Sequence, residues 1–255
     1  MSNKYNFHAA LVTGGAVRIG KAICLALADA GIAVAVHHRS SDAEAKELVD
    51  FIQKAGGKAV SVRANLSNAT ETQQLLPAAS NALSLPIDVV VNNASVFEND
   101  TLQSMTQASW DLHQAVNLRA PVTLAQVMAE ALPKGTKGCV INLIDQRVLK
   151  LNPQYFSYTA SKAGLWTVTR TMAQSLAPNV RVNAISPGPT LGNQFQAAED
   201  FELESKSVPL GVGPALEEIT GALKFLLETP SITGQMITLD GGQHLAWRTP
   251  DILED

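Results

Sequence analysis

Short apolar runs alternate with longer amphipathic segments along the whole chain. The runs are rich in Val, Ile and Ala and apolar at consecutive positions, which is typical of strands buried on both faces. The expected strands are Ala9–Thr13, Ala33–His37, Ala59–Arg63, Ile87–Asn92, Cys139–Leu143, Val180–Ile185 and Gln235–Leu239. The expected helices between them are Ile19–Ala30, Ala43–Ala55, Ala69–Leu83, Gln107–Ala131, Tyr155–Ala177 and Pro214–Glu228.

This alternation of strand and helix predicts a doubly wound α/β fold of the Rossmann type, with a parallel sheet of about seven strands and helices on both faces. No linker or internal repeat divides the 255 residues, so we expect a single domain over residues 1–255. The segment Gly188–Gly213 has no strong period and follows the sixth strand. Loops of that length are usually lids or binding loops, and we interpret this one as a substrate loop.

Composition and charge make some classes of partner improbable, but they do not identify the function. The formal net charge of −4 gives no electrostatic reason to expect nucleic acid or an anionic membrane as partner. No apolar run approaches the roughly 20 residues of a membrane span. Cys24 and Cys139 fall in different predicted elements, so we expect buried free thiols in a reducing cytoplasm. These features favour a cytoplasmic protein that acts on a small molecule, and no metal site is predicted.

A glycine-rich turn, Thr13–Gly20, joins the first expected strand to the first helix. Glycines let the backbone approach a pyrophosphate, and the following helix N-terminus supplies amides and the positive end of a dipole. Arg18 replaces the usual middle glycine and adds a guanidinium near the phosphates. The turn therefore predicts a dinucleotide cofactor.

The end of the second expected strand indicates which dinucleotide. An NAD enzyme carries an acid there for the ribose 2′-hydroxyl, but the sequence is His37-His38-Arg39-Ser40-Ser41 with no acid before Asp42. Arg39, the serine hydroxyls and Arg18 can pair with a 2′-phosphate. The alternative is a solvated basic turn. The pattern favours NADPH.

Tyr158 and Lys162 are four residues apart on an expected helix and share one face. An ammonium beside a phenol lowers the phenol's pKa toward neutral, which suits a general acid or base. Asp145 enters from the preceding strand, thirteen residues earlier, and suggests that the substrate is not a plain ketone. Asp145 is also a residue type that caps turns, so that reading stays open.

These residues together resemble the short-chain dehydrogenase/reductase superfamily over essentially the whole chain. The matching elements are Asn92-Asn93-Ala94 with Ser95 in a glycine's place, Asn117 as the helical asparagine that holds a relay water, the Tyr158–Lys162 pair, Pro187-Gly188, Thr190, and Leu239-Asp240-Gly241-Gly242. Asn65-Leu66 replaces the usual Asp-hydrophobe pair near adenine. The resemblance implies these cofactor contacts: Gly14, Arg18, Ile19, Gly20, His38, Arg39, Ser40, Asn65, Leu66, Asn93, Ala94, Ser95, Tyr158, Lys162, Pro187, Gly188 and Thr190.

Four departures from the common pattern are similar to the pteridine reductase branch, which includes bacterial dihydromonapterin and dihydrofolate reductases. They are Arg18, His38-Arg39-Ser40, Ser95 with Phe97, and Asp145 where a serine normally stands. The resemblance implies that Phe97 stacks on a pterin opposite the nicotinamide. The implied substrate contacts are Arg18, Ser95, Phe97, Asp145, Tyr158 and Leu191, with Pro189, Phe195 and Phe201 as further candidates in the loop. Core packing by Phe97, helix capping or kinking by Asn117 and a surface role for Arg18 are the structural alternatives.

The chemistry explains why a carboxyl group would join the pair. Reducing a dihydropterin C=N bond puts hydride on a ring carbon and a proton on the adjacent nitrogen. A carboxyl group accepts hydrogen bonds from the heterocycle when ionised, or delivers a proton when burial raises its pKa. The leading hypothesis is an NADPH-dependent pteridine reductase in which Asp145, Tyr158, Lys162 and Asn117 are catalytic.

Two other functions remain open at this stage. A general carbonyl reductase acting on 3-oxoacyl thioesters, sugars or xenobiotic ketones would keep Tyr158, Lys162 and Asn117 but give no reason for Asp145. A non-catalytic NADP-sensing module would have no use for the tuned phenol. The family resemblance also implies a homotetramer assembled partly through Gln107–Ala131 and Tyr155–Ala177.

Overall fold

The computed structural model describes residues 5–192 and 198–247. Its centre is a seven-stranded sheet in the order β3-β2-β1-β4-β5-β6-β7, with every neighbouring pair parallel. The strands are β1 (Ala9–Val12), β2 (Ala33–His38), β3 (Ala59–Arg63), β4 (Val89–Asn92), β5 (Gly138–Leu143), β6 (Val180–Pro187) and β7 (Met236–Leu239). The predicted doubly wound Rossmann-type sheet is confirmed.

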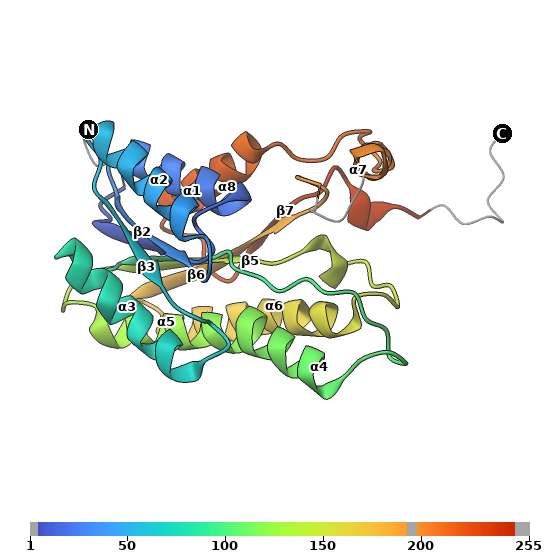
Figure 1. The fold of residues 1–255 in the computed structure, drawn as a ribbon, viewed down its shortest axis with the longest axis horizontal. Helices are drawn as coiled ribbons and strands as arrows, with labels where there is room; N and C mark the ends of the chain where they lie inside the picture. The colour runs from blue at the N-terminus through green and yellow to red at the C-terminus, as the bar shows by residue number, and fades with distance from the viewer. Residues whose placement is uncertain (1–4, 193–197, 248–255) are drawn as a thin grey trace.

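Helices cover both faces of the sheet, as Figure 1 shows. One face carries α1 (Arg18–Asp29), α2 (Asp42–Lys54) and α8 (Leu216–Glu228); the other carries α3 (Ala69–Leu83), α4 (Gln107–His113), α5 (Ala120–Ala131) and α6 (Phe156–Leu176). The inner strands β1, β2, β4 and β5 are buried along their whole length, whereas the edge strands β3 and β7 are partly exposed. Consecutive apolar residues therefore mark the strands that are covered on two sides. Both cysteines are buried and free, as expected.

The helix predicted over Gln107–Ala131 is interrupted in the structure. A π-helical turn, Gln114–Arg119 (η1), separates α4 from α5. Asn117 lies in this turn, and its side-chain amide bonds to the backbone of Val96 in the loop after β4. π-turns inside helices are often found at functional sites, and here the turn places an asparagine against a binding loop.

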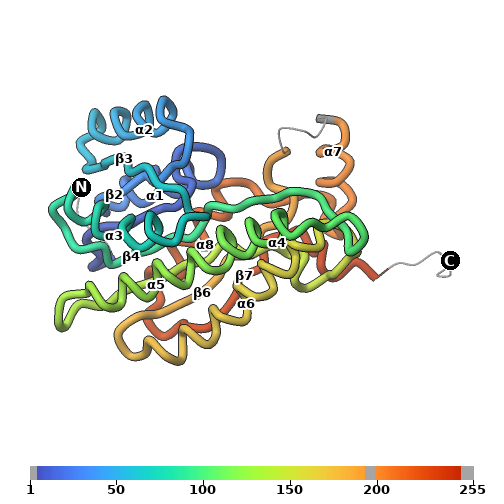
Figure 2. The backbone as a smooth tube through the Cα atoms, turned by 60° about the horizontal axis from the view of Figure 1, so that its bottom comes forward, coloured from blue at the N-terminus to red at the C-terminus, as the bar shows by residue number. Residues whose placement is uncertain are grey.

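The predicted loop Gly188–Gly213 contains a helix that its sequence did not reveal. This helix, α7 (Ala198–Lys206), begins with Glu199 and Asp200 and has few apolar positions, so it carries no clear hydrophobic period. In Figures 1 and 2 it lies at the same end of the molecule as the loop that precedes α4. Phe195, one of the predicted substrate contacts, falls in residues 193–197 and lies outside the described residues.

The sheet order reverses between β1 and β4, and their connections leave on opposite faces. Open α/β sheets bind ligands at the carboxyl ends of the strands beside such a reversal. The predicted cofactor residues lie at the ends of β1 to β6 or after them, so the fold brings them to one edge of the sheet. Within the described part of the chain, no helix is long and apolar enough to span a membrane.

Candidate active site

The glycine turn after β1 is packed so closely that it admits no larger side chain at two positions. A Cβ at Gly20 would lie 2.0 Å from the carbonyl oxygen of Gly14, and Gly14 itself has a φ of +60°. Asn93, at the end of β4, donates its side-chain amide to the carbonyls of Thr13 (2.9 Å) and Gly14 (3.0 Å). Because these two positions have no side chains, a pyrophosphate can approach the backbone of the turn closely.

His37 holds the same turn from the neighbouring strand β2. Its Nδ1 accepts a hydrogen bond from the Gly14 N–H at 3.1 Å, so its Nε2 donates to the Ala64 carbonyl, also at 3.1 Å. Burial lowers the pKa of His37 to about 4, which keeps the ring neutral in this arrangement. Sequence reasoning assigned His37 no role, although a histidine inside an otherwise apolar buried strand was an available signal.

Arg39 and the serines predicted to take a 2′-phosphate follow β2, whereas Arg18, the other candidate, begins α1 and bonds to the loop after β6. His38 is buried, and its Nδ1 has no hydrogen-bond partner among the described residues. Arg39 and Ser40 follow at the surface, before α2 begins. The same Nδ1 lies 4.0 Å from a carboxylate oxygen of Asp42, so the imidazole has an acidic neighbour. The exposed guanidinium of Arg39 and hydroxyl of Ser40 fit the charge and hydrogen-bonding needs of a phosphate dianion.

The predicted adenine contacts are less open than expected. Leu66 is 5% exposed, and the side-chain oxygen of Asn65 accepts hydrogen bonds from Ser67 N (3.1 Å) and Oγ (2.8 Å). The side-chain oxygen of Asn65 is therefore already hydrogen-bonded within its own turn.

The hydroxyl of Tyr158, which the sequence predicts to be catalytic, bonds directly to Asp145. The phenol donates to Oδ2 of Asp145 at 2.8 Å, and Oδ1 of the same carboxylate accepts the Arg147 N–H at 2.8 Å. Asp145 is thus both a turn cap and the hydrogen-bond partner of the tyrosine, and capping the turn does not prevent it from facing the site. Burial raises the pKa of Asp145 above its ordinary value, as a group that exchanges protons in a site would require.

Lys162 does not act on Tyr158 as its spacing predicted. Its ammonium donates to the Leu143 carbonyl at 2.7 Å and lies 5.8 Å from the centre of the Tyr158 ring. Burial lowers the pKa of Lys162 to about 8. Burial and the neighbouring Asp145 raise the pKa of Tyr158 well above its ordinary value. The predicted fall of the tyrosine pKa toward neutral is therefore wrong for this structure, because burial and then the Asp145 carboxylate favour the neutral phenol.

Asn117 links the loop after β4 to the catalytic helix. Its amide donates to the Val96 carbonyl (2.9 Å) and to Ser161 Oγ (3.0 Å), while its oxygen accepts the Val96 N–H (2.8 Å) and Ser95 Oγ (3.3 Å). Ser161 in turn donates to the Tyr158 carbonyl at 2.6 Å. The asparagine therefore fixes the position of Tyr158 relative to the β4 loop.

Phe97 belongs to an aromatic cluster at the site and not to the core. It is 40% exposed, its ring stacks on Tyr155 with centroids 4.2 Å apart at 6°, and it meets Tyr158 nearly edge-on at 4.7 Å. Tyr155 is the N-cap of α6 and has a φ of +53°, a backbone conformation uncommon for residues other than glycine. The sequence analysis did not predict that Tyr155 or Arg147 lies at the site, because contacts between two loops leave no regular spacing in the sequence.

Arg18 is hydrogen-bonded to the loop after β6. The Arg18 guanidinium donates to the carbonyls of Gly192 (2.8 Å) and Leu191 (3.1 Å), so it anchors the predicted substrate loop to the glycine turn. Gly188 lies so near Asp240 that a Cβ would come within 2.7 Å of it, and Thr190 donates its hydroxyl to the Gly188 carbonyl at 3.1 Å.

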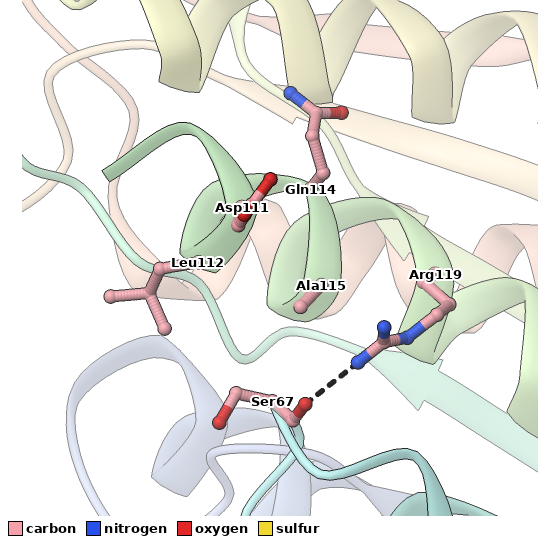
Figure 3. A pocket seen from close by; sticks show the side chains of 6 residues that line it. All are labelled: Ser67, Asp111, Leu112, Gln114, Ala115 and Arg119. Atoms are coloured by element: carbon pink, nitrogen blue, oxygen red, sulfur yellow. Dashed lines mark hydrogen bonds between the residues drawn. The ribbon is translucent and has the colours of Figure 1, made fainter. Parts of the chain in front are cut away.

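A pocket of about 500 Å³ lies between the β3–α3 connection and the α4–η1 segment (Figure 3), next to the predicted adenine contacts, since its lining residue Ser67 bonds to Asn65. Two of its lining residues are bonded to each other, since the Arg119 guanidinium donates to the Ser67 carbonyl at 2.7 Å. Gln114 points away from that pair. None of the predicted site residues lines it. The described residues hold no cluster of potential metal ligands.

A parallel doubly wound sheet, a glycine turn after its first strand and a Tyr-x-x-x-Lys helix define a dinucleotide-dependent oxidoreductase. A family model described as enoyl-(acyl carrier protein) reductase matches residues 15–244. The chain belongs to the short-chain dehydrogenase/reductase family, as its motifs predicted.

The proteins similar to this chain include dihydrofolate reductases and 3-oxoacyl-[acyl-carrier-protein] reductases. FolM alternative dihydrofolate reductase 1 from Brucella suis, solved in complex with NADP, is 50% identical over 96% of this chain and 98% of its own, with a TM-score of 0.93. The Brucella canis FolM, also with NADP, is 49% identical over 99% and 100%, with a TM-score of 0.95. A 3-oxoacyl-[acyl-carrier-protein] reductase from Synechocystis is 35% identical over 91% of this chain and 95% of its own.

Proposed function

We propose that this protein is an NADPH-dependent reductase of the C=N bond of a dihydropterin or dihydrofolate. The observation that carries the proposal is the 2.8 Å hydrogen bond between Tyr158 and a carboxylate, Asp145, where a serine is usual in the family. The similarity to the two Brucella FolM proteins supports it, because both are named dihydrofolate reductases and both exceed the identity to the Synechocystis enzyme.

The residues present fit the cofactor at its pyrophosphate and at its 2′-phosphate. The narrow turn at Gly14 and Gly20 would take the pyrophosphate, and His38 with Arg39 would take the 2′-phosphate. When bound, NADPH supplies the hydride. The cofactor proposal is tested by comparing the affinities for NADPH and NADH in the unmodified protein.

The chain's own residues would orient the substrate and move a proton. Phe97 offers a flat, partly exposed face for offset stacking with a planar ring. Asp145 can accept N–H groups from the heterocycle while its other oxygen stays bound to the Arg147 N–H. The Tyr158–Asp145 hydrogen bond stores one proton between two oxygens, from which a ring nitrogen can receive it.

A 3-oxoacyl thioester reductase is the second candidate, because relatives of that name span nearly the whole chain. A side-by-side assay of NADPH oxidation distinguishes the two functions. Its substrates are dihydrofolate, dihydromonapterin, dihydrobiopterin and acetoacetyl-coenzyme A. We expect the highest kcat/KM on one of the three nitrogen heterocycles. A higher value on the thioester would reject the proposal.

We further propose the homotetramer that the family resemblance implies. In its support, an apolar groove of about 380 Å³ runs between α5 and α6, with Val122, Ala125, Ala129, Met172 and Leu176 among its lining residues. Light scattering at micromolar concentration should report four copies. Val122→Glu should lower that number, and a monomeric unmodified protein would contradict the assignment.

A further inference from the structure

Arg147 lies two residues after Asp145, in the short 3₁₀ turn Gln146–Val148 (η2) that Asp145 caps. Its guanidinium carbon is 4.7 Å from the centre of the Tyr155 ring and 5.8 Å from that of Phe97. Among the residues that the structure describes, none accepts a hydrogen bond from this guanidinium or forms an ion pair with it. The rings of Tyr155 and Phe97 thus hold the positively charged guanidinium of Arg147 at the site. Its N–H groups have no acceptor among the described residues.

The Asp145–Tyr158 pair needs such a charge. When the pair gives up its shared proton to a substrate nitrogen, the O–H bond breaks, an N–H bond forms, and the two oxygens 2.8 Å apart are left with one more negative charge. Like charges at that separation oppose each other strongly unless a cation compensates them. Lys162 is the expected cation, but its ammonium is directed at the Leu143 carbonyl.

We propose that Arg147 is a positioning residue that supplies this compensation, with its guanidinium held beside the Asp145–Tyr158 pair by Tyr155 and Phe97. The proposal rests on the proton-transfer role assigned to the pair under the proposed function. Although burial is the main influence and raises the pKa of both Asp145 and Tyr158, the charge of Arg147 acts in the opposite direction on each. The guanidinium therefore makes the deprotonated pair easier to form.

Other charged or titratable groups around the pair come from the elements packed against it. From α6, Lys162 is the nearest cation to the Tyr158 ring. From α4, His113 lies 6.4 Å from that ring, and Asp100, in the preceding loop, accepts the Ser157 N–H at 2.9 Å. The 3₁₀ turn Gln243–Leu245 (η3) packs against η2 and carries His244, whose Nδ1 is bound to Asp240 at 2.7 Å. Burial lowers the pKa of Lys162 to about 8, so Arg147 is the group among these whose positive charge does not titrate near neutral pH.

The test is a titration of Asp145 in the full-length protein without substrate. Protein labelled with ¹³C-aspartate is followed by NMR from pH 3 to pH 8, and Asp145→Asn assigns the signal. Arg147→Met should raise the pKa of Asp145 by about half a unit to one unit, because the guanidinium is a partly exposed opposite charge nearby. Arg147→Lys should restore most of the shift. Lys150→Met, which removes an exposed charge three residues on, should leave the pKa unchanged.

An unchanged pKa in Arg147→Met overturns the proposal, and Arg147→Gln repeats the test if the methionine variant does not fold. The acid limb of the kcat profile should move upward by the same amount in Arg147→Met, with NADPH affinity retained. A shifted titration in a protein that reduces no dihydropterin would leave the electrostatic role of Arg147 standing and reject the proposed function instead.

Discussion

The two ends of the site are built in different ways. At the cofactor end, side chains such as Asn93 and His37 bind backbone atoms of the glycine turn, so the ligand-binding surface is largely main chain. At the substrate end, Asp145, Tyr158 and Phe97 meet each other through their side chains. A main-chain surface restricts which residue types can stand there. In a side-chain cluster, one substitution such as serine to aspartate can change the hydrogen-bonding groups of the site without changing the fold.

The largest effect expected at the cofactor end comes from Gly20→Ala. Its Cβ would lie 2.0 Å from the Gly14 oxygen, so we expect a loss of at least about 2 kcal/mol of unfolding free energy and a fall of at least tenfold in NADPH affinity. Urea unfolding and fluorescence titration measure both. Gly221→Ala in α8 meets no atom within 4 Å and should instead add about 0.5–1 kcal/mol. Gly20→Ala with normal stability and affinity would show that the turn is not closely packed.

Arg39→Asp should alter the cofactor preference without altering the substrate end. Replacing the guanidinium by a carboxylate removes a charge-assisted contact to the 2′-phosphate, so NADPH affinity should fall about 10- to 100-fold while NADH affinity changes little. Lys58→Asp, before β3 at the opposite edge of the sheet, makes the same change of charge and should have no effect. Equal loss for both cofactors would place Arg39 outside the 2′-phosphate site.

His37 should make the stability of the cofactor end depend on pH. Its pKa falls on folding from 6.5 to about 4, so the unfolded chain binds the extra proton between these values. Stability should therefore decrease as the pH is lowered from about 6.5 to 4, by about 3 kcal/mol from this group. His37→Gln should be less stable than the unmodified protein at pH 7.5 but lose less on acidification. Urea midpoints at four pH values compare the two, and parallel curves would exclude His37 as the cause.

The same contrast explains what the sequence could predict. The strands, the glycine turn and the Tyr158–Lys162 spacing were predictable, because burial on two faces, backbone clashes and helical geometry restrict residue types locally. The orientation of Lys162 toward Leu143 and the Tyr155–Phe97 stack were not, because they depend on loops that meet only in the folded chain. Helix α7 was missed because its charged sequence has no hydrophobic period.

The most direct test of the central claim is the Asp145→Ser variant, assayed on a dihydropterin and on a 3-oxoacyl thioester under the same conditions. If the Asp145–Tyr158 pair is the proton source for a ring nitrogen, kcat/KM on the dihydropterin should fall about 10²- to 10⁴-fold while NADPH affinity is unchanged. The thioester rate should stay level or rise, since a serine suits a carbonyl. Unchanged dihydropterin turnover in Asp145→Ser would contradict the account.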